Sequence, residues 1–258
     1  MAMLNIIFIG FKNSLSEAKK SPFNFWMAAF INFNFYVAQG FFWYAILGSK
    51  SSDYILTNDF VLIFFTTVCL VDNFYLFLFG RGSFLLTNKV KSLRLDPHLI
   101  LPINTQFLYV ATGIAFEHFL LSFLSLVLFF VVHIYLNTDI LYMFLHLIMV
   151  FEGVLVLTAI TWIIRTSIFW TSALVSIKYS NPCFKVLVRP EQSFHGLIRI
   201  ILMFVLPCLF ITGVPASVAN GLMSVKWFFI QSVITLILIL MTKLFFDIGV
   251  RRYAKYVT

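Results

Sequence analysis

The chain has 258 residues and a formal net charge of +8; 61% of its residues are hydrophobic and only 11% are charged. A soluble domain has about 45–50% apolar and about 25% charged residues, so this composition excludes a soluble enzyme or a soluble binding domain as the main body of the protein. The apolar residues fall into six long segments, and about 20 apolar residues suffice for a helix to cross a bilayer core about 30 Å thick. We predict an all-α membrane protein that forms a single transmembrane domain over residues 1–258.

The first predicted element is an amphipathic helix that lies in the membrane interface. Apolar residues recur at helical spacing, at Leu4, Phe8, Phe11 and Leu15, and basic residues lie on the wetter side. Pro22 then separates this helix from the first span. The helix is expected to anchor the chain, to act as a lever on the first span, or to do both.

Six continuous apolar segments predict six membrane-spanning helices, because lipid offers no hydrogen-bond partner to an exposed backbone. These spans cover residues 23–47, 60–79, 107–136, 140–164, 197–214 and 227–249. A single helix from Thr105 to Leu136 would measure roughly 48 Å, which exceeds the bilayer core. We therefore expect its inner third to protrude and to place Glu117 and His118 near the inner boundary.

The basic residues predict the orientation. Of the 18 Lys and Arg residues, all but Lys50 and Lys226 fall on one side of the predicted spans. The positive-inside rule assigns that side, with both termini, to the cytoplasm. The positive net charge also favours attraction of the protein to anionic lipid headgroups. A nucleic-acid partner is disfavoured because the charges are spread over several short loops.

The connection between the second and third spans predicts a short cytoplasmic helix over residues 83–95, which Asp96 and Pro97 stop. Its apolar face carries Leu86, Val90 and Leu93, and its basic residues are Lys89, Lys91 and Arg94. A short, stiff helix at this position suits docking to a soluble partner. A solvated loop that merely obeys the positive-inside rule is the alternative.

The fifth apolar segment is short and interrupted. Pro207 lies in its middle and Pro215 just beyond its end, before the last span. Broken backbone survives in a membrane only where it is buried in protein or lines water. We therefore expect re-entrant half-helices on the outer side before span six.

Two carboxylates lie inside predicted spans, Asp72 in the second and Glu152 near the middle of the fourth. Such residues are costly and mark either a translocation path or a buried contact between helices or subunits; we favour the contact. His133 and His146 are expected to pack between helices towards the outer half rather than to bind a ligand. The three widely spaced cysteines predict neither a disulfide framework nor a metal site.

Known enzyme signatures are missing from the sequence. It has no phosphate-binding loop, no nucleophile elbow and no zinc-protease motif. We therefore predict no catalytic residue, cofactor site or metal site in this chain. If transport uses ATP, the ATPase is a separate protein.

These elements together resemble an ABC transporter permease of the type 2 exporter class, within its small six-span bacterial subfamily. The segments that carry the resemblance are Leu93–Pro102 (LRLDPHLILP), Ile168–Trp170, Ile200–Ala216 (IILMFVLPCLFITGVPA) and the basic, Tyr-containing tail Gly249–Tyr256. Leu93 and Leu101 depart from the family, which usually has Gly and a basic residue at these places.

The resemblance implies a subunit of the bacterial inner membrane that pairs with a second permease copy, identical or related. Two cytoplasmic ATPase subunits, which would hold ATP and Mg, would dock against Lys89, Lys91, Leu93, Arg94 and Asp96. Substrate would pass between the permeases, and candidate residues of that path or of the interface are Asp72, Glu152, Pro207 and Pro215.

The main alternative is an ion-coupled transporter or channel that uses Asp72 and Glu152 as protonatable sites. An internal inverted repeat would favour it, and we find no convincing repeat. The sequence does not identify the substrate.

Overall fold

The computed structural model describes residues 2–48, 57–92, 94–171 and 188–257. These residues form helices and connecting loops without any strand, which confirms the all-α prediction for this part of the chain. Four of the described helical segments are long and apolar enough to cross a membrane: Asn58–Lys91, Phe116–Tyr135, Ile140–Phe169 and Lys226–Lys255. They correspond to the predicted second, third, fourth and sixth spans, so the chain is a multi-pass membrane protein.

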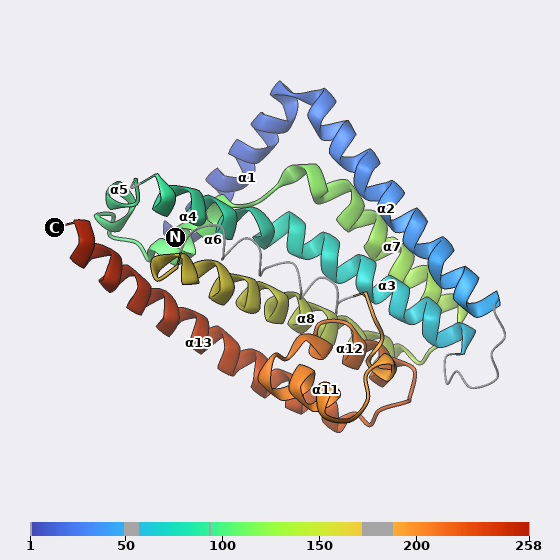
Figure 1. The fold of residues 1–258 in the computed structure, drawn as a ribbon. Helices are drawn as coiled ribbons and strands as arrows, with labels where there is room; N and C mark the ends of the chain where they lie inside the picture. The colour runs from blue at the N-terminus through green and yellow to red at the C-terminus, as the bar shows by residue number, and fades with distance from the viewer. Residues whose placement is uncertain (1, 49–56, 93, 172–187, 258) are drawn as a thin grey trace.

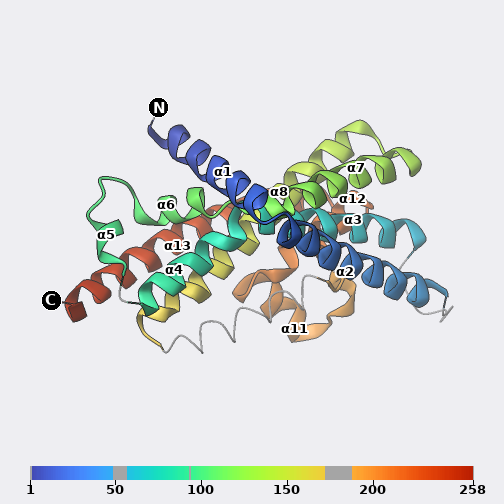
Figure 2. The ribbon, with the colours of Figure 1, turned by 90° about the horizontal axis from the view of Figure 1, so that it is seen from above.

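Figure 1 shows these helices as a bundle of α3 (Asn58–Tyr75), α7 (Phe119–Tyr135), α8 (Ile140–Thr166) and α13 (Lys226–Val257). At one end lie α4, α5 and the C-terminus, and we call this the tail end (Figures 1 and 2). At the other end lie the connection 136–139 and the start of α13, and we call this the loop end. Hydrogen bonds join Gln231 to Met149 and Thr242 to Ala159, so α8 and α13 run in the same direction.

The amphipathic helix and the first span meet at a corner. α1 (Ala2–Lys20) ends at Ser21, and Pro22 opens α2 (Pro22–Gly48), where the missing N–H of proline costs nothing (Figure 1). α2 matches the predicted first span in position and length, but it is not among the four strongly apolar segments. Its side-chain amides lower its hydropathy: Asn24, Asn32, Asn34 and Gln39.

The second span does not end where the cytoplasmic helix was expected to begin. α3 passes through a π-helical turn, Leu76–Gly80, directly into α4 (Arg81–Lys91). The prediction of a separate helix over residues 83–95 is therefore wrong. The helix instead extends the span and ends at Ser92, where the backbone leaves the helical region, and a one-turn helix, α5 (Asp96–Leu99), follows.

The prediction of one overlong third helix is also wrong. α6 (Thr105–Thr112) ends at Gly113, and a 3₁₀ turn over Phe116–His118 leads into α7. The backbone of Gly113 lies directly against that of Gly82 in α4, and a Cβ on either glycine would collide with backbone atoms. This close approach holds α6 on α4 as a separate element, and only glycine permits it.

The fifth predicted span is divided into short pieces. α11 (Gly196–Ile200) continues as a π-helix over Ile201–Val205, and the backbone leaves the helical region at Leu206 before Pro207. A 3₁₀ turn (Cys208–Phe210) then precedes α12 (Gly213–Ala219). Ten helical residues span only about 15 Å, so a single spanning helix over residues 197–214 is not formed.

The core of the bundle lies at the level of α12. Its buried side chains come mainly from α3 and α8, with Trp43 of α2 and Phe129 of α7, and Ile211 and Ala216 pack against them from the divided fifth segment. Gly153 of α8 lies against the carbonyl of Ile211, so α12 is held tightly near the middle of α8. A second core at the tail end joins α4, α6, α8, the 3₁₀ turn Ser167–Phe169 and α13.

Candidate transport and docking sites

The predicted docking segment lies at the tail end with its apolar face turned inward. Leu86 and Leu95 are fully buried in the second core, and Val90 is nearly so. The exposed side chains are Lys91 and Arg94, whereas Lys89 and Asp96 are half-buried. Leu93 lies outside the described residues. The apolar face of this helix therefore stabilises the protein and is not free to contact a partner.

Two other apolar side chains near the predicted docking segment are exposed. Ile100 is 81% exposed and Leu101 is 43% exposed, immediately after α5. Exposed apolar side chains with polar residues around them are typical of protein contact surfaces. We call this set the docking patch: Lys89, Lys91, Arg94, Asp96, Ile100 and Leu101. The basic residues of this patch could be predicted from the sequence by their charge. Nothing in the sequence indicated that Ile100 is exposed and Leu95 is buried.

The interior of the tail end contains polar rings as well as apolar side chains. Tyr109 of α6 is buried beside His98 of α5, with ring centroids 5.4 Å apart. Burial, together with the nearby Tyr253, raises the pKa of Tyr109 to about 12, so its hydroxyl stays neutral at physiological pH. Tyr109 therefore adds no charge beneath the docking patch.

Each of the two intramembrane carboxylates accepts a hydrogen bond from a neighbouring helix. Tyr36 of α2 donates to Asp72 of α3 at 2.8 Å, and Ser232 of α13 donates to Glu152 of α8 at 2.6 Å. The two carboxylates thus join different pairs of helices. This geometry is that of a contact between helices, although the second oxygen of Glu152 has no partner among the described residues.

The two prolines of the fifth segment occupy positions that suit proline. Pro207 follows the non-helical Leu206 and precedes a 3₁₀ turn. Pro215 is buried in the first turn of α12, where a backbone N–H would have no partner within the helix. Both residues thus shape the buried end of the bundle near α8. They contribute no polar group to a path.

His133 and His146 form a chain of hydrogen bonds that the sequence analysis missed. Their ring nitrogens are 2.9 Å apart, and the outer atoms of the pair contact Thr138 at 2.8 Å and Thr67 at 2.9 Å. Thr67 donates its own hydrogen to the Ile63 carbonyl, so it accepts from His146. His133 lies in the last turn of α7 and His146 in the second turn of α8, and the hairpin of these two helices brings the two rings together.

Arg199 was counted with the basic residues on one side of the predicted spans, but it packs in a different place. It forms an ion pair with buried Glu191 at 3.0 Å, and neighbouring Gln192 donates to Ser217 of α12. These contacts hold Arg199 beside α12 rather than with the other basic residues at the tail end. Burial raises the pKa of Glu191, and the charge of Arg199 partly offsets that shift. Lys178 and Lys185, counted on the same side, lie outside the described residues.

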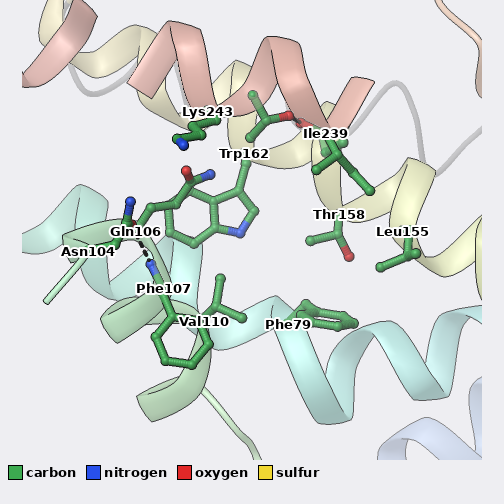
Figure 3. Close-up of a pocket in the computed structure, with 12 residues that line it drawn as sticks. Phe79, Asn104, Gln106, Phe107, Val110, Leu155, Thr158, Trp162, Ile239 and Lys243 are labelled. Atoms are coloured by element: carbon green, nitrogen blue, oxygen red, sulfur yellow. Dashed lines mark hydrogen bonds between the residues drawn. The ribbon is translucent and has the colours of Figure 1, made fainter. Parts of the chain in front are cut away.

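A cavity of about 330 Å³ opens between α6, α8 and α13 near the tail end (Figure 3). Lys243, Trp162 and Gln106 give it polar groups, and the rest of its wall is mainly apolar. A second cavity, of about 310 Å³, lies between α2, α3 and α7, and its wall is almost entirely apolar. Both volumes fall at the lower end of the range of ligand-binding sites.

Comparison with known proteins identifies one family. The family model described as "ABC-2 family transporter protein" matches residues 33–256. No curated protein and no solved structure matches the chain. The matched region includes all four strongly apolar segments, the docking patch and both cavities.

Proposed function

Because the chain belongs to the ABC-2 family of transporter proteins, we propose that it is the membrane permease of an ATP-driven exporter. In this proposal it pairs with a second permease copy, identical or related, and substrate passes between the two. Two separate ATPase subunits bind ATP and Mg and dock at the tail end, which faces the cytoplasm of the bacterial inner membrane. The export direction follows from the resemblance to type 2 exporters.

The observation that carries this proposal is the continuity of one helix. Residues 58–91 form one helical segment that runs from the core of the bundle, at Phe60 and Phe64, to the docking patch. A helix transmits a push along its axis because its backbone hydrogen bonds hold it stiff. Motion of an ATPase against Lys91 and Arg94 would therefore reach the core at Phe60 and Phe64 directly.

The amphipathic helix supplies a second connection. Glu17 of α1 pairs with Arg81 of α4 at 2.6 Å, and Ser14 accepts a hydrogen bond from the backbone of Phe116 at 2.7 Å. These contacts tie α1 both to the docking segment and to the start of α7. Since α1 meets α2 at Ser21, a displacement of α4 would also move the first span.

The directions of the helices support six crossings. Thr67 of α3 contacts His146 of α8, and Phe84 lies under Arg165 with the guanidinium 5.6 Å from the ring centroid, so α3 and α8 run in parallel. α8 and α13 also run in parallel, as shown above. The chain must therefore return to the loop end between α8 and α13. Within the described part of this stretch, α11 and α12 are the proposed re-entrant pieces.

The docking assignment is tested by reversing three charges of the docking patch, in the variant Lys89→Glu/Lys91→Glu/Arg94→Glu. We expect the variant to insert into the membrane normally and to bind its ATPase roughly tenfold more weakly, because each exposed ion pair contributes up to about 1 kcal/mol. Co-purification from mild detergent measures the association. ATP hydrolysis by the complex provides a second readout.

The matched control reverses three exposed charges of α1, in the variant Lys12→Glu/Lys19→Glu/Lys20→Glu, which changes the net charge equally. This control should retain the ATPase. Wild-type recovery of the ATPase with the docking-patch variant would contradict the assignment. Equal loss in both variants would show that net charge, rather than the patch, determines association.

A further inference from the structure

The geometry points to a binding site for an anionic phospholipid in the cavity between α6, α8 and α13 (Figure 3). In this site the negatively charged headgroup lies at Lys243 and Trp162, and the first part of an acyl chain lies along the apolar wall. The site is separate from the docking patch and from the carboxylates of the spans.

The polar groups that line the cavity are hydrogen-bond donors in need of an acceptor. Trp162 is 1% exposed, and its ring nitrogen has no hydrogen-bond partner among the described residues. Asn104 uses its side-chain oxygen to cap α6 at Phe107, which leaves its NH₂ group to donate. Lys243 is exposed and forms no ion pair within the described part of the chain. Figure 3 shows Lys243, Asn104 and Gln106 close to one another beside the indole ring.

The two threonines of the same wall have no hydrogen left to donate to the cavity. Thr158 and Thr242 each donate their hydroxyl hydrogen to a carbonyl of their own helix at 2.7 Å. No Asp or Glu is among the described residues that line the cavity. An ammonium group, an indole N–H and two amides therefore line a cavity with no carboxylate among its described residues, which favours an anion.

The rest of the wall suits a hydrocarbon chain. It is formed by Phe79, Phe107, Val110, Leu155 and Ile239. A volume of about 330 Å³ is too large for a bare phosphate ion and too small for a whole two-chain lipid. The cavity therefore holds the headgroup region and the beginning of a chain, while the remainder of the lipid stays in the bilayer.

The depth of the cavity agrees with the headgroup level of a membrane. Lys243 follows Lys226, the first residue of α13, by 17 positions, a rise of about 26 Å against a bilayer core about 30 Å thick. Lys243 therefore lies close to the boundary of the core at the tail end. Trp162 lies beside it, and tryptophan favours the same interfacial level.

Native mass spectrometry of the purified full-length chain tests this site. The chain is mixed at equal concentrations with phosphatidylglycerol, which is anionic, or with phosphatidylcholine, which has no net charge. We expect preferential binding of phosphatidylglycerol. Lys243→Ala should weaken that binding about fivefold, which corresponds to the roughly 1 kcal/mol that one basic residue contributes near an anionic lipid.

Lys255→Ala is the matched control, because it removes the same charge from the same helix outside the cavity, and it should bind phosphatidylglycerol like the wild type. Trp162→Phe keeps the aromatic ring but removes the N–H, and it should weaken binding while thermal unfolding shows that the protein still folds. Excess inorganic phosphate should not displace the lipid.

Three results would overturn the proposal: equal binding of both lipids, equal weakening by Lys243→Ala and Lys255→Ala, or full displacement by inorganic phosphate, which would indicate a simple anion site. None of these readouts depends on the ATPase. Failure of the lipid site and failure of the proposed transport function are therefore distinguished.

Discussion

Individual polar residues inside the bundle are paired across helices, and this pairing determines how their substitution should act. Tyr36 with Asp72, Ser232 with Glu152, and His133 with His146 each join two helices. Hydrogen bonds between membrane helices are worth about 1–2 kcal/mol at most. These residues are therefore expected to hold helices in register, and only a proton-coupled mechanism would require their titration.

Glu152→Gln separates these two roles. An amide oxygen can still accept the hydrogen bond from Ser232, so we expect the variant permease, reconstituted with its ATPase, to retain both transport and ATP hydrolysis. Transport assays in proteoliposomes, with hydrolysis measured in parallel, provide the comparison. Loss of transport with intact hydrolysis would favour the alternative of an ion-coupled carrier.

His146→Ala tests the buried hydrogen-bond chain. The substitution removes a ring that is 1% exposed and leaves His133 and Thr67 without their partner. We expect a loss of about 2–4 kcal/mol in the free energy of unfolding, from the cavity and the unpaired groups together. Thermal unfolding in detergent measures it. His195→Ala removes an exposed histidine and should leave the unfolding temperature unchanged; similar shifts in both variants would contradict this account.

At the scale of elements, glycine determines where helices separate. Periodicity predicted one helix through residues 105–136, because nothing between Thr112 and Phe116 interrupts the apolar pattern. The interruption comes from Gly82, which is about 30 positions earlier in the chain and accepts α6 at backbone contact. The break after α6 depends on Gly82 and Gly113 together, and neither glycine alone predicts it.

Gly82→Ala tests that contact. The added Cβ would collide with the carbonyl of Tyr109, so α4 and α6 must separate, and we expect a destabilisation of about 1–3 kcal/mol. ATPase co-purification should fall as well, because α6 supports the docking segment. Gly40→Ala is the control, since its Cβ would meet only the ring of Phe65 at 3.6 Å, an ordinary contact. An unfolding temperature equal to that of wild type for Gly82→Ala would refute the close packing.

At the scale of the whole molecule, the bundle has two chemically different ends. The tail end carries the docking patch and the C-terminal end of α13, and the loop end carries the connection 136–139 and the residues after α12. Arg199 lies beside the start of α12, apart from the basic residues of the tail end. Its ion pair with buried Glu191 accounts for this position.

Cysteine labelling tests this polarity. Single cysteines at Asn137 or Asn220 should react in intact cells with a maleimide that cannot cross membranes, whereas cysteines at Arg94 or Lys255 should react only after the cells are opened. The unsubstituted chain reports the background from its own cysteines. Reaction of the Asn220 and Lys255 variants from the same side would contradict an odd number of crossings between these two residues.

The sequence by itself determined the helical class, the positions of four spanning segments and the break at Pro207, because each depends on residues that are neighbours in the chain. A continuous apolar segment must be buried in lipid or in the protein core. Proline lacks a backbone N–H donor at any position. Tertiary structure alone decided that α4 continues α3 with its apolar face buried, that α6 is a separate helix, that two histidines share a hydrogen bond, and that Arg199 lies beside α12. Each of these depends on a contact between distant segments, and a contact of that kind has no periodicity in the chain.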